Sequence, residues 1–274
     1  MSITLVFGLT GQIGVALQPM LGDGFGPVLA LSRRPPPTRS GIEWAQDTLE
    51  NFAAAPAGCA RILSLGPLDA FAAWVARTQP QAARIVAIGS TARMHKRDSP
   101  DAGERDDAQR LEHAEQALFE YGRRHGTAVT VLRPSLLYGN GLDRSLTPLA
   151  LRARRWRVLP WPRGATGLRQ PVHVEDVARA VLTCLPAEAS HGRGFDLPGG
   201  ETLPFDAMVA RCLARQAEGA HLLRLPDAVF TLGLRLVGLG AETQGWLWRA
   251  RRDQLADAGA AFEAFGFEPR PFQP

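Results

Sequence analysis

Three glycines near the beginning of the chain have the spacing of a phosphate-binding turn. Gly8, Gly11 and Gly14 directly follow the apolar run 3–7, and helix-forming residues come next. In such a turn the first glycine permits a tight bend, the second lets a pyrophosphate approach the backbone, and the third lets helix and strand pack closely. The phosphates would bind free N–H groups at the positive end of the helix dipole. The sequence therefore favours a dinucleotide site over an empty glycine-rich turn, and its candidate contacts are Gly8, Thr10, Gly11, Gln12, Ile13 and Gly14.

The residues after the second apolar run bear on which dinucleotide is bound. An acidic residue about twenty positions after the glycines binds the ribose 2′-hydroxyl of NAD, whereas arginine accommodates the 2′-phosphate of NADP. Here Ser32, Arg33 and Arg34 follow the run 28–31, with no carboxylate at that tip. A guanidinium can bind a phosphate with two parallel hydrogen bonds. The alternative is that both arginines are merely solvated, and we favour NADP over NAD.

Four further side chains could take part in chemistry. Ser90 and Thr91 follow the apolar run 84–88 and could bind a substrate carbonyl or a cofactor carboxamide, or simply cap the end of that strand. Lys96 could supply a proton or bind an anion, or it could be an ordinary exposed loop lysine. His173 could line a substrate pocket, and Asp176 is expected to cap a helix over 177–185. Among His, Cys, Asp and Glu, no cluster has metal-ligand spacing.

The first half of the chain alternates apolar runs with helical patterns. The strands are expected at 3–7, 28–31, 42–45, 60–63, 84–88 and 128–132, and the helices include 12–21, 68–78 and 106–124. Strands that are apolar throughout indicate a parallel sheet covered on both faces. The alternation of strand and helix predicts an α/β fold, a Rossmann-type doubly wound parallel sheet with right-handed crossovers.

The alternation of apolar runs and helical patterns ends after the Gly139-Asn140-Gly141 turn. An arginine-rich helix, a Pro/Gly loop, a strand–helix unit at 170–185 and then mostly helices follow. We therefore expect an NADP-binding Rossmann domain over 1–149, to which 170–190 returns, and a smaller, mostly helical substrate or partner lobe over 150–274. That lobe would lie at the carboxyl edge of the sheet, where ligands bind in such folds.

Composition is that of a water-soluble enzyme rather than a disordered or membrane protein. Hydrophobic residues make up 45% of the 274-residue chain and charged residues 21%, and the net charge is +4. No apolar stretch has the length of a membrane span, and no signal peptide is recognisable. Cys59, Cys184 and Cys212 are far apart and odd in number, which is typical of a reducing compartment. The expected location is the cytoplasm.

Several motifs together resemble the NAD-dependent epimerase/dehydratase family of the extended and atypical short-chain dehydrogenase/reductase superfamily. They are 7–14, 63–67, 90–91, 132–139, 171–178, 195–201 and 265–272. The chain is most similar to the atypical subgroup that includes the NADPH-binding accessory subunit of respiratory complex I. The resemblance places a catalytic serine or threonine at Ser90-Thr91. It also implies further cofactor contacts: Asp47 at the adenine, Leu65 and Gly66 beside the cofactor, and Pro134 and Ser135 by the nicotinamide.

One departure from this family concerns the catalytic pair. Active members carry Tyr-x-x-x-Lys, in which the lysine lowers the tyrosine pKa so that the phenol transfers a proton near neutral pH. Of the 31 Lys and Arg residues Lys96 is the one lysine, and neither Tyr121 nor Tyr138 has a lysine four positions later. The pair therefore cannot form, and we expect both tyrosines on the surface. The helix after the fifth strand instead offers charged residues that we interpret as a solvated face: Asp106, Asp107, Arg110, Glu112 and His113.

Two stretches of the second half have more than one interpretation. One basic turn around Trp156 (Arg152, Arg154, Arg155 and Arg157) could bind a phosphate-bearing substrate or an acidic partner, and we expect no nucleic acid because stacking partners are missing. The apolar residues of 226–239 (Val229, Phe230, Leu232, Leu236 and Val237) are expected to pack in the core, with a partner or membrane surface as the alternative.

Three functions remain open at this stage. The first is an NADP(H)-binding protein of the epimerase/dehydratase type, active as an oxidoreductase or isomerase on a small, anionic or phosphate-bearing substrate with a non-standard proton donor: Ser90, Thr91, Lys96 or His173. The second is a non-catalytic NADPH-bound scaffold or sensor. The third is a sugar-nucleotide epimerase, which ranks lowest because oxidation of a sugar hydroxyl needs a general base. An oligomer is compatible with all three.

Overall fold

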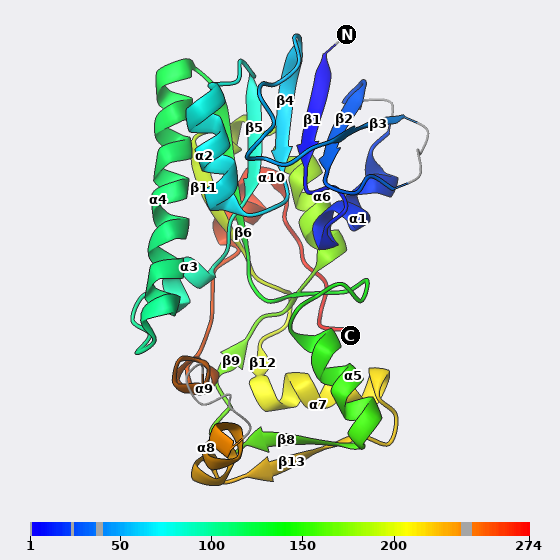
Figure 1. Cartoon of the computed structure of the whole chain (residues 1–274), viewed down its shortest axis with the longest axis vertical. Coiled ribbons are helices and arrows are strands. Elements are labelled where there is room, and N and C mark those ends of the chain that lie inside the picture. The colour runs from blue at the N-terminus through cyan, green and yellow to red at the C-terminus, as the bar shows by residue number, and fades with distance from the viewer. Residues whose placement is uncertain (1, 23–24, 37–40, 237–242) are drawn as a thin grey trace.

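The computed structural model describes residues 2–22, 25–36, 41–236 and 243–274. Within them, seven strands form one sheet in the order β11-β6-β5-β4-β1-β2-β3, and every neighbouring pair is parallel (Figure 1). The strands are β1 (Ile3–Phe7), β2 (Val28–Ser32), β3 (Ile42–Gln46), β4 (Cys59–Ser64), β5 (Arg84–Ile88), β6 (Ala128–Pro134) and β11 (Arg193–Leu197). The predicted doubly wound parallel sheet is confirmed.

Helices cover both faces of this sheet, which explains why its central strands are mainly apolar. On one face lie α1 (Gln12–Leu17), α6 (Val174–Cys184) and α10 (Gly259–Phe265), and on the other lie α2 (Leu68–Thr78) and α4 (Ala102–His125). Val6 of β1 packs in the core with α1 and α6, while its neighbours Leu5 and Phe7 pack with α2 and α4. Alternate side chains of one strand thus enter different cores.

Two of the expected helices have different ends in the structure. The helix expected at 12–21 divides into α1 and a 3-10 turn over Gln18–Met20, where Pro19 has no N–H to continue the α-helical ladder. The helix expected at 106–124 begins four residues earlier, because Asp101 caps it: its Oδ1 accepts from the Glu104 N–H at 2.9 Å. Both differences follow from local capping chemistry.

The seventh strand, β11, is absent from the strands expected from the sequence. It pairs in parallel with β6, from Arg193 opposite Thr130 to Leu197 opposite Pro134. Its sequence contains Gly194 and Asp196 between apolar residues, so it lacks the continuous apolar run of the other strands. The segment that returns to the sheet therefore extends beyond the expected 170–190, and α10 also packs on β11.

A second lobe lies below the carboxyl ends of the sheet strands, at the end of the molecule opposite the N-terminus (Figure 1). It contains α5 (Leu146–Trp156), β8 (Val158–Pro162), α7 (Phe205–Gln216), β13 (His221–Leu225), α8 (Asp227–Leu236) and α9 (Thr243–Arg251). The expected boundary after residue 149 falls inside α5. Leu146 and Ala153 at opposite ends of this helix enter the lobe core, so the whole helix belongs to the lobe.

Short strand pairs make this lobe less helical than expected. β8 and β13 pair in parallel, β9 (Leu168–Arg169) pairs with β12 (Leu203–Pro204), and β7 (Leu137–Tyr138) pairs with β10 (Val172–His173). The β7–β10 pair lies where the chain passes from the sheet to the lobe. It therefore helps to position both parts of the site described below.

Apolar residues of α8 are more exposed than the core packing expected for 226–239. Phe230 is half-buried, and its ring contacts the Trp246 ring at a centroid distance of 5.9 Å. Val229, Leu232 and Leu236, however, are 51%, 58% and 79% exposed. The prediction of core packing is therefore wrong for these three. Val237 and the remaining positions up to 239 lie outside the described residues.

The three cysteines are buried and free. Burial raises the pKa of Cys184 to about 12, so its thiol stays protonated and behaves as a small apolar group. Within the described residues, no helix combines the length and apolar character needed to cross a membrane.

Gly14 is the position in the turn where a larger side chain is expected to destabilise the fold most. A Cβ atom there would overlap the backbone carbonyl of Leu9, because α1 runs directly against the end of β1. Neither group can move without shifting the backbone, and overpacking of this kind costs about 1–3 kcal/mol or more. We expect Gly14→Ala to lower the melting temperature clearly, as measured by calorimetry. A melting temperature equal to that of the original protein would contradict the close approach.

Candidate functional site

The glycine turn bends sharply at Gly8 and lies against the end of β4. Gly8 has φ +79°, a conformation that side chains disfavour, and a Cβ atom there would lie 3.0 Å from both Gly66 N and Leu65 C. The Gly11 N–H donates to the Gly8 carbonyl at 2.9 Å and closes the turn. This brings Leu65 and Gly66 beside the turn, and their contact with a cofactor stays a prediction.

A cavity of about 470 Å³ opens between this turn and the first residues after β6. One wall is the turn itself, the floor is the β6–β7 corner, and the other wall is the loop that enters α5. Its lining residues are Thr10, Gly11, Gln12, Ser135, Leu136, Leu137, Leu142, Arg144 and Ser145. The sequence identified four of these in advance (Thr10, Gly11, Gln12 and Ser135). Leu136 and Leu137 lie within the 132–139 motif, whereas Leu142, Arg144 and Ser145 come from a segment with no periodic or motif signal.

The tip of β2 presents cations without counter-ions. Arg33 and Arg34 are exposed, and neither guanidinium forms a hydrogen bond or ion pair within the described part of the chain. The Ser32 side chain is buried at this tip and accepts from the Arg34 N–H at 3.2 Å. Asp47 lies alongside, since its N–H donates to the Ser32 carbonyl at 3.2 Å. The strand end therefore combines a hydroxyl with two free guanidinium groups.

Ser90 and Thr91 lie at the carboxyl end of β5, next to the end of β6. The Thr91 hydroxyl is buried and donates to the Pro134 carbonyl at 3.4 Å. The Ser90 Oγ accepts from the Ala92 N–H at 3.1 Å, which leaves its own O–H free to donate. Ser90 therefore supports the turn after the strand. Its hydroxyl proton remains free to donate to a ligand.

Lys96 is not a free loop lysine. The preceding residues form a short helix, α3 (Ala92–His95), and Lys96 Nζ lies 2.9 Å from Asp107 Oδ2 of α4. The hydrogen bond from Lys96 is the main reason that the pKa of Asp107 is lowered. Asp107 was expected to belong to a solvated face, but it takes part in this pair across α3 and α4. Lys96 thus forms an ion pair with a carboxylate and does not pair with a tyrosine.

Both tyrosines are buried, which corrects the expectation that they lie on the surface. Tyr121 is 7% exposed near the end of α4 and donates to the Pro80 carbonyl, and Tyr138 is 2% exposed. Burial raises the pKa of each phenol. Each ring fills core volume and each hydroxyl finds a partner, as is usual for a buried tyrosine. Neither phenol is prepared to act as a base near neutral pH.

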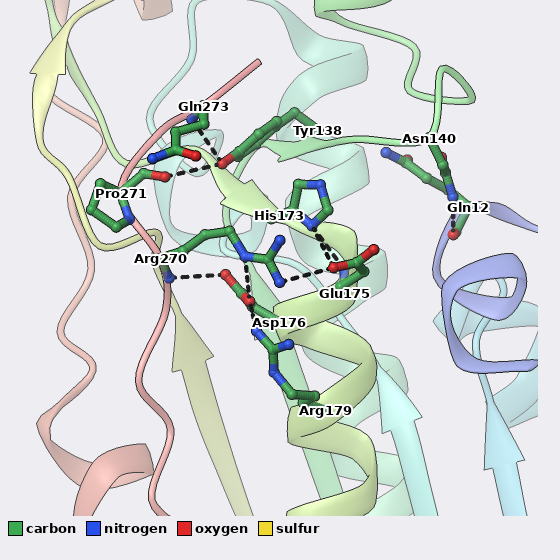
Figure 2. A network of polar contacts seen from close by, with 10 residues as sticks. All are labelled: Gln12, Tyr138, Asn140, His173, Glu175, Asp176, Arg179, Arg270, Pro271 and Gln273. Carbon is green, nitrogen blue, oxygen red and sulfur yellow. Dashed lines mark hydrogen bonds and ion pairs between the residues drawn. The ribbon is translucent and has the colours of Figure 1, made fainter. Parts of the chain in front are cut away.

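The Tyr138 hydroxyl instead belongs to a network around the last residues of the chain (Figure 2). It donates to the Pro271 carbonyl at 3.3 Å and accepts from the Gln273 N–H at 3.2 Å. The His173 ring packs edge-on against the Tyr138 ring, with centroids 5.0 Å apart. Residues 271–273 therefore lie beside the β7–β10 pair.

His173, and not Asp176, caps α6. The helix begins at Val174, and His173 Nδ1 accepts from the Glu175 N–H at 3.3 Å. Burial lowers the pKa of His173, as does the nearby Arg270 cation. The ring is therefore neutral when it caps, with the proton on Nε2. Asp176 is already inside the helix, one turn too late to cap it.

Asp176 has a different role, since it holds the C-terminal segment. It is 2% exposed and accepts from both the N–H and the Nε–H of Arg270, at 3.0 and 2.9 Å. Arg179 donates to the same carboxylate, and Glu175 accepts from Arg270 at 2.9 Å (Figure 2). This ion network attaches residue 270 to the start of α6.

A second buried ion network lies under the ends of β5, β6 and β11. Arg133 donates to Glu115 at 2.9 Å and to Asp196 at 3.2 Å. These charges are paired with each other, so they serve to hold α4 against the sheet rather than to bind a ligand. Nearby, burial lowers the pKa of His95, and the Arg169 cation of the lobe lowers it further. His95 therefore faces the lobe as a neutral ring.

The candidate residues of the sequence are thus distributed over separate places. The glycine turn and Ser135 line one cavity, whereas Ser32, Arg33 and Arg34 lie at the β2 tip. Lys96 pairs with α4 and His173 caps α6, and neither lines that cavity. Their expected convergence near a nicotinamide stays a prediction. The sequence did not identify Arg144 as a residue of the cavity wall. It also did not predict that Asp176 holds the C-terminal segment.

Comparisons with known proteins agree with this architecture. The family model described as "NAD dependent epimerase/dehydratase family" matches residues 111–197. Among curated proteins, no match to the sequence was found. Many solved structures share the fold, with identities too low to show more than that.

Three of these structures are representative. An epimerase from Methanothermobacter thermautotrophicus is 14% identical with a TM-score of 0.72, over 98% of this chain and 88% of that one. The UDP-glucuronic acid 4-epimerase of Bacillus cereus in complex with NAD is 12% identical with a TM-score of 0.71, over 98% and 92%. The UDP-glucose 4-epimerase of Thermotoga maritima with UDP-glucose is 14% identical with a TM-score of 0.72, over 97% and 93%.

The family match runs from the second half of α4 to β11. It includes the floor of the cavity, the Arg133 network and the Asp176 side of the other ion network, whereas Arg270 lies outside it. The overall fold is shared with the epimerase structures. Residues 111–197 are therefore similar to the NAD-dependent epimerase/dehydratase family, and the chain as a whole shares the fold of these epimerase structures.

Proposed function

We propose that this protein binds NADP(H), with the pyrophosphate on the glycine turn and the nicotinamide half in the cavity toward Ser135. The observation that carries the proposal is the shape of the turn. Gly11 is exposed at the cavity wall, and Gly8 adopts a positive φ that leaves the backbone open on this side. A side chain at residue 11 would occupy the space that a pyrophosphate needs. When bound, the nicotinamide would supply or accept a hydride.

The β2 tip supports NADP over NAD. The 2′-phosphate distinguishes the two cofactors, and it carries charge that an exposed, unpaired guanidinium can neutralise. Arg33 and Arg34 are such groups, and no acidic side chain ends β2 to bind a 2′-hydroxyl. The B. cereus epimerase structure contains NAD. The preference proposed for this chain therefore rests on its own strand end.

We expect NADPH to bind more tightly than NADH, and Arg33→Ala to remove most of that preference. Loss of a charge-assisted contact to the 2′-phosphate should cost about 1.5–3 kcal/mol for NADPH and little for NADH. Calorimetric titration of both cofactors measures this directly. Arg163→Ala is a suitable control, because Arg163 is exposed in the lobe, far from the β2 tip. Equal affinities for both cofactors, or an unchanged preference in Arg33→Ala, would refute the assignment.

The chemistry proposed for this site does not use a tyrosine–lysine pair. The Ser90 hydroxyl is the best-placed donor, because its proton is free and it ends β5 at the carboxyl edge of the sheet. Thr91 and Lys96 already have internal partners and would have to exchange them to act, and His173 uses its Nδ1 to cap α6. We therefore propose an oxidoreductase or isomerase with a degenerate catalytic site, acting on a small, anionic substrate in the cytoplasm.

A second candidate function is a non-catalytic NADPH-bound scaffold or sensor. The specific observation in its favour is that the groups a short-chain reductase would use are occupied. Both tyrosine hydroxyls bond to backbone groups, and the one lysine pairs with Asp107. Stereospecific transfer of deuterium from labelled NADPH to any product would exclude the scaffold, whereas tight NADPH binding without transfer would favour it.

A further inference from the structure

The cavity wall opposite the glycine turn is a loop that two side chains hold in place. Residues 139–145 connect β7 to α5. Asn140, in the left-handed region at φ +48°, donates from Nδ2 to the Gln12 carbonyl at 2.8 Å (Figure 2). Asp143 caps α5 and accepts from the N–H groups of Ser145 and Thr147, each at 3.0 Å. The loop is therefore attached to the turn before any ligand binds.

Arg144 is carried on this loop without an internal partner. Its carboxylate neighbour Asp143 is 7% exposed and is already used by the helix cap. Within the described part of the chain, no polar group bonds or pairs with the Arg144 guanidinium, which is exposed and lines the cavity. A guanidinium has five N–H donors and no acceptor, so the group it is suited to bind is an anion.

The facing wall presents a second donor without a partner. Gln12 also lines the cavity, and its side-chain Nε2 is buried with no hydrogen-bond acceptor among the described residues. Buried donors are rarely left unpaired, because an unmade hydrogen bond costs free energy. The Gln12 backbone carbonyl is occupied by Asn140, so a ligand acceptor would satisfy the amide that the protein itself does not.

We infer that Arg144 and Gln12 bind a diphosphate between them, with Gln12 on the side of the glycine turn and Arg144 on the opposite side of the cavity. This inference rests on the proposed function, which makes the cofactor pyrophosphate the expected diphosphate. A diphosphate carries acceptor oxygens on all sides, so it can bond to the turn and to Arg144 together. The other source of the same chemistry is a diphosphate on the substrate.

The test is a calorimetric titration of the whole chain and its variants with NADPH, 2′-AMP and UDP. Arg144→Ala should weaken NADPH binding by about 10- to 100-fold, the range of one charge-assisted hydrogen-bonded contact. The same substitution should leave the affinity for 2′-AMP unchanged, because that ligand has the adenine end of the cofactor and no diphosphate. Arg144→Lys should recover part of the affinity, since it restores the charge but not the fork. Arg215→Ala, an exposed arginine of α7, is the control and should match the original protein.

The titrations distinguish a failure of the Arg144 inference from a failure of the proposed NADP(H) binding. NADPH and UDP affinities in Arg144→Ala that both equal the original values would overturn the inference. Loss of UDP binding with NADPH binding unchanged would keep the diphosphate site and assign it to the substrate. A protein that binds UDP through Arg144 but no dinucleotide would refute the proposed function alone. Because the Arg144 side chain is exposed and has no hydrogen bond or ion pair to lose among the described residues, each Arg144 variant should keep the original melting temperature.

Discussion

Replacing Gly11 with valine is expected to abolish dinucleotide binding while the protein stays folded. Gly11 has φ −81° and ψ 178°, which any residue can adopt, and it is exposed. A Cβ atom there would lie 3.1 Å from the Gly8 carbonyl oxygen, a tight contact that a small shift relieves. The branched methyl groups would then fill the space where a pyrophosphate must approach the backbone. We expect the Kd for NADPH to rise by about 100-fold or more.

Titration by calorimetry or cofactor fluorescence measures this change, and a thermal melt shows that the fold is retained. Gly14→Ala is the matched comparison three residues away. It should lower the melting temperature because its Cβ would overlap the Leu9 carbonyl, whereas Gly11→Val should change stability little. Affinity for NADPH that survives in Gly11→Val would mean that the glycines serve packing alone, and the proposed binding site would have to be abandoned.

We also expect the protein to show no detectable epimerase turnover on UDP- and GDP-sugars. Epimerisation through a keto intermediate removes a hydroxyl proton as hydride passes to the cofactor, and general-base assistance contributes about 10²–10⁴-fold. In this chain Tyr121 and Tyr138 are buried with raised pKa values, and Lys96 is paired with Asp107. Turnover should therefore lie about 10²–10⁴-fold below the usual 1–10³ s⁻¹ of enzymes, which is the contribution of the missing general base.

The measurement is an incubation with NADP⁺ or NADPH and a panel of sugar nucleotides without oxygen, followed by chromatography of the products. The T. maritima UDP-glucose 4-epimerase, a structure of similar fold, is the positive control. If slow product does form, Ser90→Ala should reduce it further, because Ser90 has the free hydroxyl proton at the site. Turnover of about 1 s⁻¹ or faster would show that a proton carrier exists which the structure does not identify.

Local patterns in the sequence determined the sheet and the first wall of the site. A strand buried on both faces is apolar along most of its length, so runs such as 84–88 identified β5 to the residue. The glycine spacing identified the turn, since glycine adopts the positive φ of Gly8 without steric cost and has no Cβ atom to block the close approach at Gly14. The lack of Tyr-x-x-x-Lys is likewise a property of the sequence alone, because four-residue spacing on a helix can be read directly.

Tertiary structure alone decided which distant residues meet. β11 contains glycine and aspartate, and it becomes a strand only because β6 offers an unpaired edge at that place. The burial of Tyr138 depends on residues 271–273, and Asp176 is occupied by Arg270, which is 94 positions away. Arg144 reaches the glycine turn because Asn140 attaches its loop to Gln12 across 128 positions. Contacts between such distant positions leave no periodic signal, since they depend on how the packed elements bring their ends together.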